Sequence, residues 1–212
     1  KYLREVNKTY GSEDYLVLTY TPKKKLLDEE TINNLTNLKN DLSNLDWTNN
    51  VITILDVPLL KNNDDPLSER IKNFKTLSSK NVNKERGFDE IIKSPIYEEF
   101  VISKDGKTSG IIVYIKKNKA LNQLKVKNKK NIEIYKDNLK KKNHKNILQI
   151  REIIKSYNDV GKIYLGGIPM IADDMMSFIK SDIIVFGLGV LLFIIVTLWF
   201  VFKKLIWIIV PI

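Results

Sequence analysis

Residues 183–202 read IIVFGLGVLLFIIVTLWFVF, and none of these twenty side chains carries a charge. As an α-helix, a stretch of this length spans roughly 30 Å, the thickness of the hydrocarbon core of a bilayer. A helix buried in a soluble protein usually keeps a polar face, and this stretch has none. The sequence therefore predicts a transmembrane α-helix over residues 183–202.

The residues that flank this helix mark the expected membrane boundaries. Asp182 precedes it, Lys203 and Lys204 follow it, and apolar residues resume at 205–212. Two lysines suffice only for a tight turn, so we expect residues 205–212 to begin another transmembrane helix of a multi-pass protein. The chain begins at Lys1 without a signal peptide, and we expect it to be part of a longer polypeptide.

Orientation follows from the same two lysines. Lysines in a short loop favour the cytoplasmic side, whereas a long soluble region crosses the membrane regardless of its charge. We therefore expect the body before the helix to lie on the periplasmic, extracytoplasmic side of the inner (cytoplasmic) membrane. The chain has no cysteine, which excludes disulfides and cysteine chemistry, and it is long enough to fold around a hydrophobic core without them.

The net charge of +10 comes from one lysine-rich segment, residues 116–145. That segment holds 12 lysines against Glu133 and Asp137, so the rest of the chain sums to zero. It has no arginine and almost no aromatic residues, which argues against nucleic acid as a partner. We interpret it as a solvated, charged insertion, with contact to anionic lipid head groups as the alternative.

The first half of the body shows strand and helix patterns. Residues 15–20 (YLVLTY) predict a strand that stops at Pro22. Asp28 can cap the following helix, whose apolar residues recur at helical spacing: Ile32, Leu35, Leu38, Leu42 and Leu45. Residues 51–57 (VITILDV) predict a second strand, and residues 67–77 predict a helix in the polar stretch after it.

The second half predicts a hairpin, a helix and a strand. Asp105 and Gly106 form a turn in which both residues can take positive φ, so residues 100–104 should pair with 107–111. A second amphipathic helix, ended by Gly161, is expected from Ile147, Ile150, Ile153, Ile154 and Tyr157. Residues 162–168 (KIYLGGI) predict the last strand.

Once insertions are ignored, the order strand, helix, strand, strand, helix, strand predicts the fold class of the body. It is typical of an α+β domain with ferredoxin-like (split βαβ) topology, a four-stranded antiparallel sheet with both helices on one face. We expect this domain to cover residues 1–168 and to continue into a helical stalk, residues 169–182, and then the transmembrane helix.

The junction between the last strand and the stalk holds candidate hinge or coupling residues. Gly166 and Gly167 tolerate unusual φ, and Pro169 disfavours helix immediately before it, so we expect the helix to begin near Ile171. The alternative is that these residues merely shape a connection.

Two acidic residues of the stalk are the other coupling candidates. Asp173 and Asp174 would lie in the first turn of a helix that begins near Ile171, where carboxylates interact favourably with the helix dipole.

No catalytic constellation is found in the sequence. His144 is the only histidine and lies among lysines and asparagines, which do not offer the partners of a metal site. Phosphate-binding, nucleophile-elbow and zinc-protease motifs are missing. We expect a protein that is not an enzyme and that needs no cofactor.

Several stretches resemble one transporter family, the resistance-nodulation-division (RND) superfamily, in its branch of predicted exporters and MMPL-like lipid transporters. The similarity covers the chain from about Val6 to the end and omits the lysine-rich segment. The stretches are NKTYGSEDYLVLTY (7–20), DVPLL (56–60), SPIYEEFVISKDGKTSGIIV (94–113) and LGGIPMIADDMMSFIKSDIIVFG (165–187).

This resemblance implies a proton-driven exporter of hydrophobic or amphipathic substrates, such as lipids or drug-like molecules. The chain would be its first extracytoplasmic porter domain, of ferredoxin-like fold, with the second transmembrane helix and the opening of the third. Its partners would be membrane lipids, the remaining helices and a second porter domain of the same polypeptide, and the resemblance leaves a homo-oligomer open. From Ile183 onward the chain has no Asp or Glu, so the proton-carrying residues are expected elsewhere.

Two further functions stay open. The chain could belong to a membrane-anchored extracytoplasmic sensor or assembly subunit that binds a peptide or envelope polymer. It could also belong to a sterol-sensing type of lipid receptor that shares topology with the exporters and does not pump.

Overall fold

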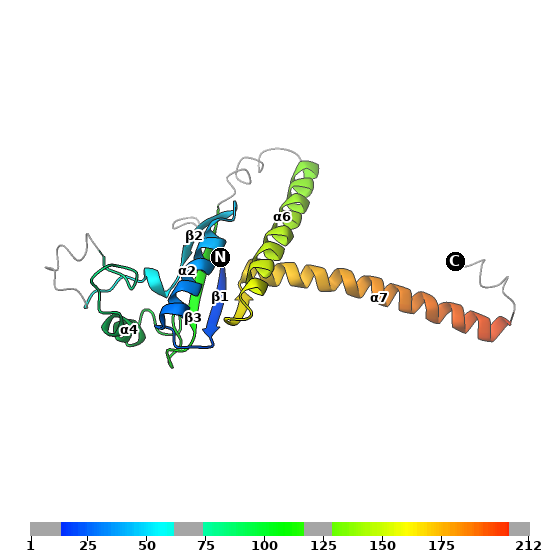
Figure 1. Ribbon diagram of the computed structural model, residues 1–212. Helices are drawn as coiled ribbons and strands as arrows, with labels where there is room; N and C mark the ends of the chain where they lie inside the picture. The colour runs from blue at the N-terminus through cyan, green and yellow to red at the C-terminus, as the bar shows by residue number, and fades with distance from the viewer. Residues whose placement is uncertain (1–13, 62–73, 117–128, 204–212) are drawn as a thin grey trace. The chain divides into compact units, whose positions relative to one another are not determined.

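The structure is a computed structural model that describes residues 14–61, 74–116 and 129–203. The chain divides into two compact units, Lys1–Met170 and Ile171–Ile212. The elements in chain order (Figure 1) are β1 (Tyr15–Pro22), α2 (Glu29–Ser43), β2 (Thr48–Ile52), the 3-10 helix η1 (Ile54–Asp56), α4 (Lys84–Ile92), β3 (Ser109–Ile115), α6 (Lys129–Ser156), β4 (Gly161–Gly166) and α7 (Ile168–Phe202).

The four strands form one antiparallel sheet in the order β2-β3-β1-β4. β1 is central, and its Leu18 lies opposite Ile111 of β3 on one side and Leu165 of β4 on the other. β2 pairs with β3 and forms one edge. The prediction of an α+β domain with a four-stranded antiparallel sheet is confirmed.

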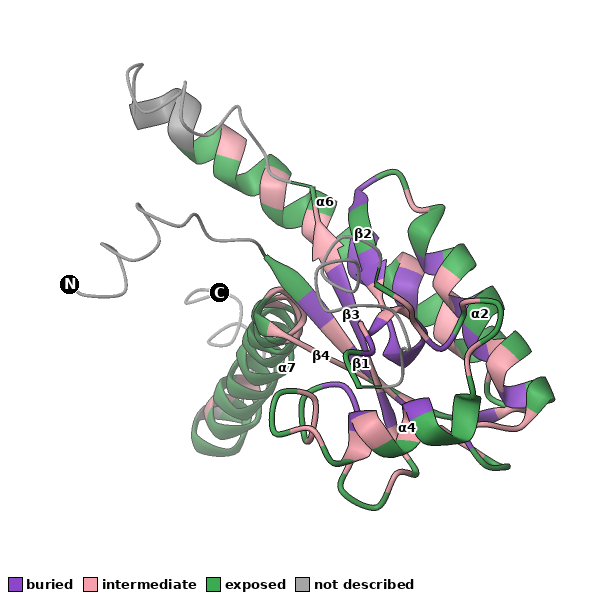
Figure 2. Ribbon diagram, turned by 90° about the vertical axis from the view of Figure 1, so that its left-hand side faces the viewer, coloured by how far each residue is buried: buried purple, intermediate pink, exposed green. Residues whose placement is uncertain are grey.

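The hydrophobic core lies between one face of this sheet and two helices. Alternate residues of the strands point to opposite faces, and one of these sets is buried. Helices α2 and α6 cover this buried set (Figure 2). The core residues of the two helices are Leu35, Leu38 and Leu42 of α2 and Ile147 and Ile150 of α6, and they pack with Leu16, Leu18, Ile111 and Val113 of the strands.

Helix α2 begins after Asp28, as predicted, but the Asp28 side chain does not cap it. Its carboxylate instead accepts a hydrogen bond from the backbone N–H of Lys25, at 3.1 Å. Asp28 therefore stabilises the turn that leads into the helix.

The second strand is shorter than the sequence predicted. β2 ends at Ile52, because Thr53 starts η1 instead of continuing the strand predicted to reach residue 57. The Thr53 hydroxyl accepts from Leu55 N–H, and the Asp56 carboxylate accepts from Thr53 N–H at 2.9 Å. This reciprocal capping satisfies backbone groups that would otherwise need a partner strand.

The helix predicted over residues 67–77 is not found where the structure describes that range. Residues 62–73 lie outside the described residues, and Lys75 is bridged to Leu59 rather than helical. Among the described residues after this range, the next helix is α4, which was not predicted from the sequence. It begins where the Asn83 side chain accepts from Arg86 N–H.

The predicted hairpin turn exists, but the strand before it does not. Of the two turn residues, Gly106 has a positive φ, 67°, and Asp105 does not, so the expectation of two such residues is wrong for Asp105. Ile102 forms a single bridge to Ser109, where β3 begins. Residues 96–101 instead form turns, which bring Phe100 beside the sheet rather than into it.

Helix α6 is longer than predicted and begins inside the lysine-rich segment. Residues 129–145 of that segment are helical, and residues 117–128 lie outside the described residues. The helix ends at Ser156, before Gly161, which is the first residue of β4 and not a helix terminator.

Candidate functional site

A single residue, Gly167, separates strand β4 from helix α7. Its φ is 119°, a conformation that side chains rarely permit. A Cβ at this position would lie 3.0 Å from the carbonyl oxygen of Tyr15 and 3.2 Å from Cα of Leu16. Both the backbone conformation and the neighbouring strand therefore require glycine here.

Gly166 differs from Gly167, although both were predicted to be hinge residues. Gly166 ends β4, lies opposite Val17 and has no positive φ, which corrects the expectation of an unusual conformation there. A Cβ would meet only the carbonyl oxygen of Val17, at 3.7 Å. Of the two hinge candidates, only Gly167 is conformationally demanding.

Pro169 does not delay the helix. α7 begins at Ile168, three residues before the expected start near Ile171, and Pro169 lies in its first turn. Proline is tolerated there because its missing N–H has no helical partner. The Pro169 carbonyl accepts a hydrogen bond of 2.9 Å from the Asn143 side chain, which ties the start of α7 to α6.

The earlier start also moves the two stalk carboxylates. Asp173 and Asp174 lie in the second turn of α7, and its first turn contains no acidic residue. The predicted interaction with the helix dipole in the first turn is therefore wrong, since that effect falls off beyond the terminal turn.

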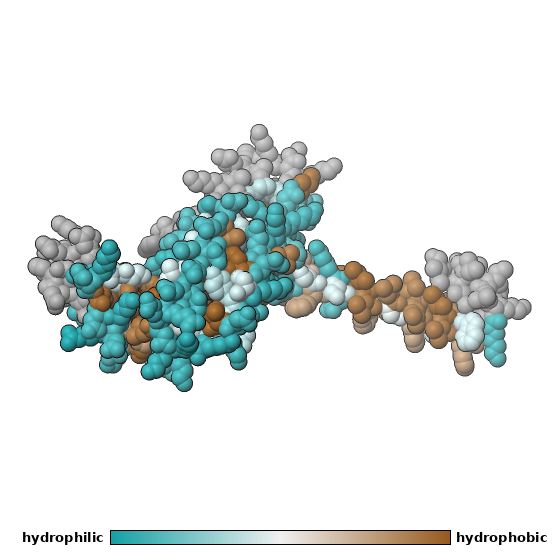
Figure 3. Space-filling view, viewed as in Figure 1, coloured by the Kyte–Doolittle hydropathy of each residue, from teal (hydrophilic) through white to brown (hydrophobic). Residues whose placement is uncertain are grey.

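Helix α7 passes through Asp182 without a break and ends at Phe202. Within the described residues it is the one helix long and apolar enough to cross a membrane. Figure 3 shows its surface as largely hydrophobic. Lys203 ends it with a φ of 52° and donates its N–H to the Trp199 carbonyl; Lys204 and residues 205–212 lie outside the described residues.

A groove in the first unit was not predicted from the sequence. It lies at the β2 and β3 side of the sheet and has a volume of about 730 Å³. Its lining includes Ile52 of β2 and Ile112 and Tyr114 of β3, which alternate with the core-facing residues. The turns of residues 96–101 supply another side of the groove, with Ile96, Tyr97 and Phe100.

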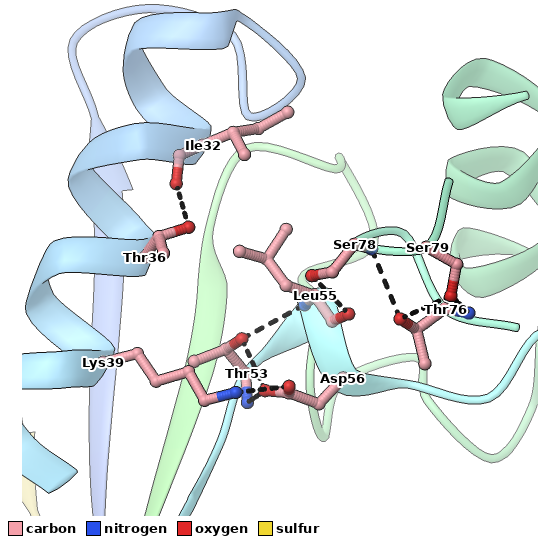
Figure 4. A network of polar contacts seen from close by, with 9 residues as sticks. All are labelled: Ile32, Thr36, Lys39, Thr53, Leu55, Asp56, Thr76, Ser78 and Ser79. Atoms are coloured by element: carbon pink, nitrogen blue, oxygen red, sulfur yellow. Dashed lines mark hydrogen bonds and ion pairs between the residues drawn. The ribbon is translucent and has the colours of Figure 1, made fainter. Parts of the chain in front are cut away.

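One charged pair lies in this largely apolar lining. Lys39 of α2 and Asp56 of η1 form a salt bridge, with side chains 29% and 28% exposed. Asp56 also accepts hydrogen bonds from Thr53, so its carboxylate is held from two sides (Figure 4). Alternating apolar residues on the outer face of β3 are the signal that could have pointed to this groove.

In the part of the chain that the structure describes, no group of three or more His, Asp or Glu side chains is close enough to hold a metal ion. His144 lies on an exposed turn of α6.

Comparison with known proteins gives no assignment. Neither a scan against models of protein families nor a search among curated proteins finds a match for this chain. What stands is an α+β domain with a four-stranded antiparallel sheet, followed by one long apolar helix.

Proposed function

We propose that the chain is part of a proton-driven RND-type membrane transporter that exports a hydrophobic or amphipathic substrate. In this proposal the first unit is a porter domain on the extracytoplasmic side, and α7 spans the inner membrane. The order β2-β3-β1-β4 and the placement of α2 and α6 on one face support a ferredoxin-like topology for that domain.

The observation that carries the proposal is the direct connection of β4 to α7 through Gly167. Strand β4 pairs with the central strand β1, so a displacement of the helix start would act on the sheet itself. A loop of several residues would absorb such a movement, whereas one conformationally restricted residue transmits it. In the proposed transporter, this connection would couple the membrane helix to the porter domain during alternating access.

The remaining parts of the proposal follow from the sequence resemblance. Membrane lipids surround α7, and further helices and a second porter domain of the same polypeptide complete the transporter, with a homo-oligomer as the alternative to a single copy. The proton-carrying carboxylates lie in other helices, and the chain performs no chemical reaction, so it needs neither an enzyme's active site nor a cofactor.

The test compares two matched variants in the full-length protein that contains this chain. Gly167→Val should lower the export of a hydrophobic fluorescent dye from energised vesicles by about tenfold, because valine cannot keep the φ of 119°. Gly166→Val should stay within about twofold of wild type, since valine is favoured in strands.

Both variants should resist alkaline extraction from membranes as wild type does, which shows that insertion is intact. Equal export by Gly167→Val and wild type would refute the coupling role. Loss of insertion in Gly167→Val alone would also refute it, because the residue would then serve folding rather than transport.

The groove favours a second candidate function, a membrane-anchored receptor. A receptor needs an extracytoplasmic ligand site and an anchor, and the groove and α7 fit these two roles. The same export assay separates the two functions, because wild-type vesicles of a receptor would export no dye.

A further inference from the structure

We propose that the groove binds a single-chain amphiphile whose head group carries no net charge. The apolar chain would lie along β2 and β3, and the head group would face Lys39 and Asp56. This inference rests on the proposed function, because the membrane that holds α7 supplies such molecules.

The groove combines a buried floor with an exposed apolar rim. Ile112 on the floor is only 4% exposed, although it belongs to the sheet face that does not pack on the helices. Ile96 and Phe100 on the rim are 69% and 61% exposed. Apolar side chains that gather at one exposed concave site are typical of a binding site, because an occupant would remove them from water.

Backbone hydrogen bonds hold the residues of the rim in one conformation. Glu99 has a φ of 61°, which is uncommon for a residue with a side chain. Its N–H donates to the carbonyl of Ile102 at 2.8 Å, and the N–H of Phe100 donates to the carbonyl of Tyr97 at 3.2 Å. These bonds hold Phe100 at the rim, so the groove is formed before a ligand arrives.

The volume of about 730 Å³ limits the occupant to a small molecule. Pockets for ligands of drug size measure roughly 300–1,000 Å³, and a single-chain amphiphile falls in this class. The polar groups are confined to the Lys39 and Asp56 pair and to Asn50 and the Tyr97 and Tyr114 hydroxyls, so most of the ligand must be apolar.

The charges of the groove select the head group. Lys39 and Asp56 are the charged residues of its lining and sum to zero. An anionic head group would meet the Asp56 carboxylate, and a cationic one would meet the Lys39 ammonium, in a place where water is partly excluded. A zwitterionic head group can offer each of them an opposite charge.

The experiment uses the whole chain in phospholipid nanodiscs. Because the chain has no cysteine, Ile96→Cys provides one labelling site for an environment-sensitive dye at the rim. Lysophosphatidylcholine with a 14-carbon chain, titrated below its micelle concentration, should give a saturable blue shift of the dye. Tetradecanoate, of the same chain length but anionic, should bind about tenfold more weakly.

Two variants in the Ile96→Cys background locate the site. Ile52→Trp places a bulky side chain in the groove and should weaken lysophosphatidylcholine by at least about tenfold. Tyr164→Trp is the matched control, because Tyr164 lies on β4, outside the groove lining, and is 66% exposed. Circular dichroism of each variant shows that the fold is kept.

A third variant tests whether the charges of the groove select the head group, because it should reverse the preference between lysophosphatidylcholine and tetradecanoate. Asp56→Asn keeps an oxygen that can accept from Thr53 and leaves Lys39 as the charged group of the lining. Tetradecanoate should then bind more tightly than lysophosphatidylcholine. A purely structural role of Asp56 would weaken both ligands alike.

The proposal is overturned if the dye shift rises without saturation, or if Ile52→Trp and Tyr164→Trp respond equally. It is also overturned if tetradecanoate is preferred by wild type, or if an extended apolar peptide gives the shift and the lipid does not. The binding measurement involves no transport step. A negative binding result therefore says nothing about the coupling role of Gly167, and unchanged export by Gly167→Val says nothing about binding in the groove.

Discussion

At the scale of single residues, the two ends of β4 show how close packing, and not conformation alone, makes glycine necessary. Gly161 has no positive φ, yet a Cβ there would lie 2.7 Å from the carbonyl oxygen of Thr21 and 2.7 Å from the ring of Tyr20. At Gly166 the nearest atom would be 3.7 Å away. The same strand therefore contains one glycine with no space and one with space.

We predict that Gly161→Ala destabilises the domain and Gly166→Ala does not. Forcing a methyl group against Thr21 and Tyr20 should cost about 1–3 kcal/mol of unfolding free energy. Gly166→Ala should be neutral or stabilising by about 0.5 kcal/mol, because alanine loses less conformational entropy in a strand. Chemical unfolding of the whole chain in detergent measures both; equal stabilities would contradict the packing argument.

At the scale of elements, helix α6 joins two environments. Towards its C-terminal end it contributes Ile147 and Ile150 to the core. Nearer its N-terminal end Lys136, Lys140 and Lys141 are exposed, and Lys141 pairs with Asp137 one turn away at 2.8 Å. The exposed lysines agree with the interpretation of the segment as a solvated, charged face.

The end of α6 is tied to α2 by a side-chain hydrogen bond. Just beyond α6, the Tyr157 hydroxyl donates to the Asp41 carboxylate at 2.6 Å. Partial burial, and then the bond to Asp41 and its negative charge, raise the pKa of Tyr157 above its ordinary value of 10.0. The two helices are thus linked by a group that ionises only at high pH.

We predict that Tyr157→Phe changes the alkaline stability of the domain. Because the folded pKa is raised, the bond contributes fully below pH 10 and is lost as the pH rises further. The variant should be less stable by about 1 kcal/mol at neutral pH, and its stability should fall less steeply above pH 10 than that of wild type.

Thermal unfolding at a series of pH values from neutral to 12 measures this difference. Tyr164→Phe serves as the control, because Tyr164 is 66% exposed and its loss should leave the pH profile unchanged. A Tyr157→Phe profile parallel to that of wild type would contradict the assigned role.

At the scale of the whole molecule, an α+β domain and a long apolar helix share one chain. The large side chains of α7 from Ile183 to Val201 are mostly more than half exposed, in contrast to the buried core of the domain. Water is an unfavourable solvent for such a surface. A bilayer removes this cost, and the helix has the length to span one.

We predict that three charges in α7 abolish membrane insertion. Leu191→Arg, Leu192→Arg and Ile195→Arg together should cost roughly 8–10 kcal/mol of insertion free energy, enough to offset the apolar contribution of the helix. The whole chain should resist alkaline extraction and float with liposomes, and the triple variant should do neither. A triple alanine variant at the same positions is the matched control and should stay inserted.

A chain that remains monomeric and dissolved without detergent would contradict this prediction and the proposed transporter with it.

Whether a feature could be predicted from the sequence depends on how far apart in the chain the residues that specify it lie. The spacing of Leu35, Leu38 and Leu42 predicted α2, and the apolar run from residue 183 predicted the apolar part of α7. These patterns are local, because the spacing of apolar side chains in a helix or strand is set by residues that are close together in the chain. The order of strands and helices in the domain followed from them.

The boundaries depended on contacts that periodicity does not contain. β2 stopped at Ile52 because Thr53 and Asp56 cap each other. α7 began at Ile168, directly after Gly167, which adopts a φ of 119° close to the backbone of Tyr15. The positions of Asp173 and Asp174 within α7 changed as a consequence.

By itself, the sequence determined that the chain combines an α+β domain with an apolar helix of membrane length. Only the tertiary structure decided that Ile52, Tyr97 and Ile112 line one groove, with Lys39 and Asp56 in its wall. The physical reason is distance along the chain. A helix or strand is specified by neighbours a few residues apart, whereas a groove exists only after strand pairing and packing bring distant segments together.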